Sequence, residues 1–63
     1  MMIIVNRKAR EVPEGTTIGG LMKQLRLHGY YALLNFQPVS GGEYDSYCLQ
    51  EGDDVRFVRM EAL

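Results

Sequence analysis

The chain has 63 residues, a formal net charge of −1 and a single cysteine, and these totals exclude several classes of protein. So short a chain forms one domain, over residues 1–63, whose stability depends on a closely packed core. Cys48 has no second cysteine for a disulfide, and with His28 it supplies too few ligands for a closed zinc site. The near-neutral charge, with acidic and basic residues interleaved, argues against nucleic-acid binding.

The start of the chain carries no signal for export or for membrane insertion. Residues 1–5 run directly into Asn6, Arg7 and Lys8, with no small-residue cleavage site and no apolar stretch of about 20 residues. The free thiol of Cys48 suits a reducing compartment. We therefore expect a soluble, cytoplasmic chain that is a monomer on its own and does not bind a membrane.

The first predicted element is a β-hairpin. Residues 2–5 are apolar and mostly β-branched, residues 6–8 are a polar turn, and residues 9–12 alternate modestly before Pro13. Proline cannot donate to a strand ladder, so Pro13 ends the second strand.

From Thr17 onward the apolar spacing becomes that of a helix. Apolar residues recur at i, i+3, i+4 and i+7, at Ile18, Leu21, Met22 and Leu25. Thr16 or Thr17 is the predicted N-cap, and Gly29 is the predicted left-handed residue that ends the helix. Gly19 and Gly20 each cost about 1 kcal/mol relative to alanine, so this helix depends on packing.

The second half of the chain predicts two further strands around an irregular connection. Residues 30–36 are aromatic and aliphatic and predict a strand, in which Tyr30 and Tyr31 point to opposite faces. Residues 37–46 are mostly loop, and residues 47–49 form either a short strand or a turn.

The last predicted strand covers residues 55–60 and follows a tight turn at residues 51–54. Val55 and Phe57 share one face of it, and Val58 and Met60 share the other. The acidic residues of the preceding turn, Glu51, Asp53 and Asp54, lack the spacing of a calcium loop, so a solvated turn is expected.

The order of these elements predicts an α+β fold of the β-grasp (ubiquitin-like) type. We expect a mixed sheet of four to five strands with one helix packed on one face. The first and last strands are the most apolar, so they are expected to pair centrally and in parallel through a helix-containing crossover.

Several segments, in this order, resemble the ThiS family of sulfur carriers and, more distantly, the MoaD family. The most specific are residues 12–17 (VPEGTT) and residues 49–55 (LQEGDDV). Asn35 stands where these carriers have an Asn-Gly turn, with Phe36 in place of the glycine, and Tyr44 stands where an aromatic residue is often found.

The resemblance implies a sulfur carrier of thiamine (thiazole) biosynthesis that is not itself an enzyme. A ThiF-like adenylating enzyme would activate its C-terminal carboxylate with ATP, sulfur would replace AMP to give a thiocarboxylate, and thiazole synthase would take up the sulfur. These carriers end in Gly-Gly, whereas this chain has Ala62 and Leu63 at those positions. The carrier tail is thus predicted by position, although its pattern is not matched.

The residues themselves predict no catalytic group, no cofactor and no metal ligand. Partner docking is predicted for Phe36, Tyr44, Arg56 and Met60, because exposed aromatic residues and arginine are favoured at interfaces. A second set of basic residues could form a patch on the solvent face of the sheet: Arg7, Lys8, Arg10, Arg56 and Arg59.

Two alternatives remain open from the sequence. Cys48 could be a nucleophile or a persulfide acceptor rather than a structural thiol. A reactive cysteine needs a nearby base or helix N-terminus, and the one histidine, His28, lies at the opposite end of the predicted helix from its N-terminus. The whole chain could also be a β-grasp interaction module without carrier chemistry, because the Gly-Gly tail is missing.

Overall fold

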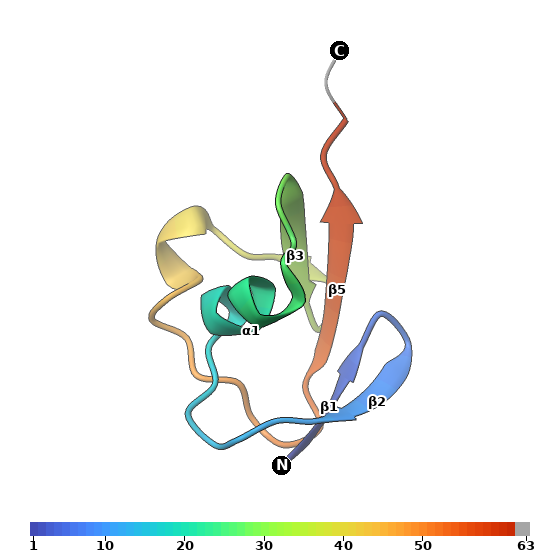
Figure 1. The fold of residues 1–63 in the computed structure, drawn as a ribbon, viewed down its shortest axis with the longest axis vertical. Coiled ribbons are helices and arrows are strands. Elements are labelled where there is room, and N and C mark those ends of the chain that lie inside the picture. The colour runs from blue at the N-terminus through green and yellow to red at the C-terminus, as the bar shows by residue number, and fades with distance from the viewer. Residues whose placement is uncertain (62–63) are drawn as a thin grey trace.

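The computed structural model describes residues 1–61, which form one mixed sheet with a helix on one face (Figure 1). The strands are β1 (Met2–Val5), β2 (Lys8–Glu11), β3 (Tyr30–Leu34), β4 (Gln37–Pro38) and β5 (Asp54–Arg59). The helices are α1 (Ile18–Leu25) and the 3₁₀ helix η1 (Gly41–Glu43). The sheet order is β2-β1-β5-β3-β4, with β1 and β5 parallel at the centre. This architecture confirms the predicted β-grasp fold.

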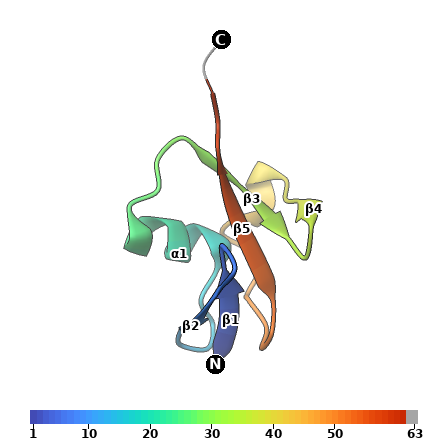
Figure 2. The same cartoon turned by 90° about the vertical axis from the view of Figure 1, so that its right-hand side faces the viewer.

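The hydrophobic core lies between α1 and the inner face of the sheet (Figure 2). Its buried members are Ile3, Val12, Ile18, Leu21, Ala32, Leu49, Val55 and Phe57. Val55 and Phe57 point inward, as their alternation along the last strand predicted, and Tyr31 is more exposed than its neighbour Tyr30.

The helix begins as predicted but ends earlier. Thr17 is the N-cap, and its hydroxyl accepts a hydrogen bond from the Gly20 N–H at 3.0 Å. The C-cap is Arg26, which is left-handed with φ 56°, so the prediction that Gly29 ends the helix is wrong. The chain leaves the helix here and closes it with a bond from the Leu27 N–H to the Met22 carbonyl at 3.0 Å. This exit lets Leu27 pack against the core.

Two tight hairpin turns use residues other than glycine in left-handed conformations. Asn6 and Arg7 have φ 47° and 72°, and Asn35 and Phe36 have φ 49° and 71°. Both angles are positive in each turn, which is the geometry of a type I′ turn, where Asn-Gly is preferred. The strand predicted over residues 30–36 therefore stops at Leu34, and the chain turns into β4, which the sequence did not predict.

Candidate functional site

The candidate site is the end of β5 and the arm that follows it. The Met60 N–H donates to the Gly29 carbonyl at 2.7 Å, which is the last main-chain bond along β5 in the described chain. Met60 is 55% exposed, and Glu61, the next residue, is also exposed. Figures 1 and 2 show the chain beyond β5 leaving the body of the domain. The predicted tail residues Ala62 and Leu63 lie outside the described residues.

Three of the four predicted docking residues lie on the outer face of the sheet. Phe36 is 67% exposed, and the Arg56 guanidinium carbon lies 4.7 Å from the centre of its ring. Arg56 also donates from Nε to Asp54 Oδ1 at 3.3 Å. Met60 follows four residues after Arg56 on the same side, at the opposite end of β5. Three more exposed apolar side chains are Met2, Ile4 and Tyr31.

Tyr44, the fourth predicted docking residue, lies elsewhere and has a structural contact. It follows η1, packs partly buried against the core, and accepts a hydrogen bond on its hydroxyl from the Ala32 N–H at 2.9 Å. This N–H points away from β5, toward the outer edge of β3, so the hydroxyl closes an edge that β4 is too short to cover. A docking role for Tyr44 stays a prediction.

The basic residues do not form the single patch predicted for the solvent face. Lys8 and Arg10 stand opposite Val5 and Ile3 in the β1–β2 register. Because opposed residues share a face, they lie on the side of the sheet where Ile3 is buried. Arg56 lies on the other side, so the sheet itself separates these cations.

In the turn before β5, Glu51 and Gly52 are exposed, as expected of a solvated turn, but the prediction is wrong for Asp53, which lies in a buried polar cluster. Asp53 is 8% exposed. Its carboxylate accepts hydrogen bonds from the Tyr47 hydroxyl at 2.9 Å, from the Gln50 N–H at 2.8 Å and from Asn35 Nδ2 at 3.3 Å. Burial, followed by the hydrogen bond to Asp53 and the charge of this carboxylate, raises the pKa of Tyr47 above its usual value of 10.0.

This cluster shows that the acidic turn has a structural role. Asn35 also accepts from the Asp54 N–H at 3.0 Å, so one amide side chain joins the β3–β4 turn to the start of β5. No group of three or more histidine, cysteine, aspartate or glutamate residues that could hold a metal ion occurs in residues 1–61.

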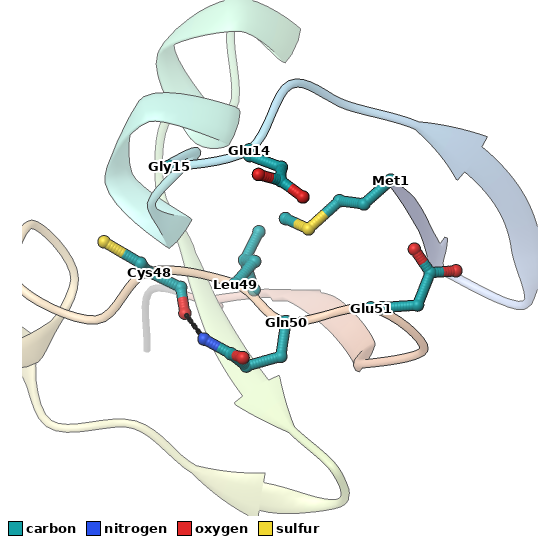
Figure 3. Close-up of a pocket in the computed structure, with 7 residues that line it drawn as sticks. All are labelled: Met1, Glu14, Gly15, Cys48, Leu49, Gln50 and Glu51. Carbon is teal, nitrogen blue, oxygen red and sulfur yellow. Dashed lines mark hydrogen bonds between the residues drawn. The ribbon is translucent and has the colours of Figure 1, made fainter.

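A cleft of about 320 Å³ lies at the far end of the domain from the arm (Figure 3). It is lined by Met1, Glu14, Gly15, Cys48, Leu49, Gln50 and Glu51. Figure 3 shows the Cys48 thiol at the rim, directed away from Met1 and from both carboxylates. Cys48 is exposed, and its backbone forms an isolated bridge with Thr17. The bridge places the Cys48 backbone beside the N-cap of α1, while no hydrogen bond to the thiol itself is found within residues 1–61.

The strand order and the packing of α1 on one face of the sheet define a β-grasp, ubiquitin-like domain whose last described residues, Met60 and Glu61, are exposed. The fold is similar to the crystal structure of the thiamine biosynthesis protein ThiS from Geobacter metallireducens. The TM-score is 0.87 over 100% of this chain and 99% of that chain, with 22% sequence identity. The sequence matches no protein-family model, and no curated protein matches it at a significant level. The chain therefore has a ThiS-like fold, as the resemblance predicted.

None of the helices in residues 1–61 is long and apolar enough to cross a membrane.

Proposed function

We propose that this protein is a sulfur carrier that serves thiazole formation in thiamine biosynthesis. The observation that carries the proposal is the full-length similarity of its fold to a ThiS structure, with a TM-score of 0.87. Further support comes from the arm after Met60, which begins where the last bond to Gly29 ends.

In this proposal the chain supplies a carboxylate and its partners supply the chemistry. A ThiF-like enzyme binds ATP, an oxygen of the C-terminal carboxylate attacks the α-phosphorus, and pyrophosphate leaves. Sulfide then attacks the acyl carbon, and AMP leaves with its oxygen, which gives a thiocarboxylate. Thiazole synthase consumes this sulfur and returns the carboxylate.

The short arm limits where the partner enzyme can dock. Three residues follow Met60 in the sequence. An extended peptide of three residues spans at most about 10 Å, so a carboxylate carried on Leu63, as this proposal has it, would react close to the end of β5. The partner must therefore contact the domain beside this end, and the exposed side chains of Met60 and Tyr31 are available there.

The proposal is tested by carrier-dependent pyrophosphate release from ATP in the presence of a purified ThiF-like enzyme. We expect release with the native chain and faster release with the double variant Ala62→Gly, Leu63→Gly, because glycine has no Cβ to obstruct a narrow channel. A chain truncated after Met60 is the matched control and should give none. If neither full-length chain stimulates release above this control, the carrier proposal is wrong.

A second candidate function, an interaction module without sulfur chemistry, is favoured by Phe36. A phenylalanine held at φ 71° and 67% exposed is strained without being buried, and such strain often marks functional positions. Under this alternative, the chain truncated after Met60 keeps full affinity for its partner, and Phe36→Gly loses it. Under the carrier proposal, truncation abolishes adenylation.

A further inference from the structure

The main-chain groups of β5 alternate between its two neighbours. On the β3 side, the Asn35 N–H donates to the Asp54 carbonyl and the Met60 N–H to the Gly29 carbonyl, both at 2.7 Å. Residues with even numbers in β5 therefore direct their N–H and C=O groups toward β3, and residues with odd numbers direct theirs toward β1.

The β1 side of β5 is filled only along its first half. The Asn6 N–H donates to the Val55 carbonyl at 3.0 Å, and the Phe57 N–H donates to Asn6 Oδ1 at 2.7 Å. The asparagine side chain thus adds one last bond to the parallel ladder. Beyond it the chain turns at Arg7 and folds back as β2, as Figure 1 shows.

A free edge remains on β5 above this hairpin. We define it as the carbonyl of Phe57 together with the N–H and carbonyl of Arg59, none of which has a hydrogen-bond partner within residues 1–61. In Figure 1 the upper half of β5 has β3 on one side and no strand on the other. Unpaired groups on a strand edge are a template for an added strand.

Two other edges of the sheet, on β3 and on β2, are protected. On β3 the outward N–H of Ala32 is covered by the Tyr44 hydroxyl, and its carbonyl accepts from the Val39 N–H at 3.2 Å. On β2 all four residues are exposed, and three of them carry a charge, which discourages strand pairing. The free edge of β5 has no such covering contact, the charges beside it are of one sign, at Arg7 and Arg59, and it leads directly into the residues after Met60.

We infer that an extended strand of the adenylating enzyme pairs with the free edge of β5, in the place that β1 vacates. This inference rests on the proposed function and adds how the partner holds the arm. Main-chain bonds to Arg59 would fix the direction of the next residues, so the carboxylate would enter the partner site in one register. Arg7 and Arg59 flank the edge, are exposed, and have no ion pair in the described chain, so the added strand is expected to carry acidic side chains.

A second copy of the chain fits this edge poorly. Antiparallel pairing centred on Arg59 places the two Arg59 residues directly opposite each other, and like charges in that position are destabilising. Pairing centred on Val58 instead carries the residues after Met60 of the second copy toward Val55, where Asn6 already binds. A heterologous strand avoids both conflicts.

The inference is tested with Arg59→Pro, which removes the outward N–H. Because this N–H makes no internal bond, the β3–β5 ladder stays intact, and proline is compatible with an edge position. Arg59→Ala is the matched control, since it removes the same side chain and keeps the N–H. With a ThiF-like enzyme and ATP, we expect Arg59→Pro to weaken binding about tenfold or more relative to Arg59→Ala.

Amide hydrogen exchange of the native chain provides a second measurement that does not depend on how the proline variant folds. We expect the amides of Arg59 and Glu61 to exchange rapidly in the free protein and to become protected in the complex. Binding without this protection, or equal affinities for the two variants, overturns the inference and leaves the carrier proposal standing. Failure of the native chain both to bind and to be adenylated counts against both.

Discussion

The two halves of β5 differ in how they are held, although they belong to one continuous strand. The first half has β1 on one side and β3 on the other, and it follows the cluster in which Asp53 accepts three hydrogen bonds. The second half has only β3 beside it and ends with the bond from Met60 to Gly29. One end of the strand is thus a fixed part of the core, and the other end is accessible.

This difference explains how so small a domain can present an accessible strand end without losing its fold. Val55 and Phe57 are buried and hold β5 in the core. Arg59 and Met60, which follow, are exposed, so the core loses no buried contact when a partner binds them. The acidic turn at Asp53 was expected to be solvated, but the hydrogen bonds of Asp53 make it part of the fixed end. The function is expected at the other end.

The largest effect is predicted for Asp53→Ala, which should destabilise the fixed half of β5. The substitution leaves the partly buried Tyr47 hydroxyl and the Gln50 N–H without their acceptor. We expect a loss of about 2–4 kcal/mol in the free energy of unfolding, measured by urea denaturation. Glu14→Ala, at an exposed carboxylate, is the control and should change stability by about 0.5 kcal/mol or less. Equal effects of the two substitutions would show that the cluster does not hold this end.

A second test compares two adjacent glycines in the first turn of α1, which packs against the segment that leads into β5. A Cβ on Gly19 would overlap the Asp45 carboxylate and lie 3.2 Å from the Tyr44 carbonyl, to which the Gly19 N–H donates at 2.8 Å. A Cβ on Gly20 meets only the Thr17 hydroxyl, at 3.2 Å.

We therefore expect opposite signs from the two alanine substitutions. Gly19→Ala should lower the free energy of unfolding by about 1–2 kcal/mol, because crowding outweighs the gain in helix propensity. Gly20→Ala should raise it by about 0.5 kcal/mol. Thermal unfolding of both variants checks this, and stabilisation by Gly19→Ala would contradict the close packing described.

A third test uses the two type I′ turns, which join β1 to β2 and β3 to β4 and both lie beside the first half of β5. Arg7→Gly should stabilise the protein by about 1 kcal/mol, because it relieves a left-handed residue and removes no cation–π contact or ion pair found in the described chain. Phe36→Gly should gain less, about 0.5 kcal/mol, because it also removes the ring under Arg56. Chemical denaturation gives the order of the two gains, and a larger gain for Phe36→Gly would argue against a stabilising cation–π contact.

The smallest effect concerns pH. The folded-state pKa of Tyr47 lies above its ordinary value of 10.0, so the folded protein favours the protonated phenol. This contribution to stability is complete below about pH 10 and is lost as the pH rises through the raised pKa. Native protein should therefore lose stability above pH 10 more steeply than Tyr47→Phe does. Parallel curves for the two proteins would show that this phenol does not couple folding to pH.

The sequence predicts the elements whose apolar spacing is regular, and it misses features that depend on contacts between distant residues. The spacing from Ile18 to Leu25 predicts the helix and its N-cap. It does not predict the left-handed Arg26, because that conformation depends on how Leu27 meets the core. Asp53 appears solvated in the sequence because its partners Asn35 and Tyr47 come from other segments.

Only the part of the candidate site that depends on local sequence patterns could be predicted. The exposure of Met60 follows from strand alternation, and the exposure of Phe36 follows from its position in a turn. The free edge of β5 does not, because it arises from the difference in length between β1 and β5 and from their register, which no local pattern records. The role of the Tyr44 hydroxyl on β3 is also a matter of tertiary contact.

The most direct test of the carrier account is the intact mass of the native chain after incubation with a ThiF-like enzyme, ATP and sulfide. The account predicts a species in which one oxygen of the C-terminal carboxylate is replaced by sulfur, formed only when ATP is present and lost on addition of thiazole synthase and its substrates. A chain whose mass stays unchanged under conditions that convert a Gly-Gly carrier would contradict it.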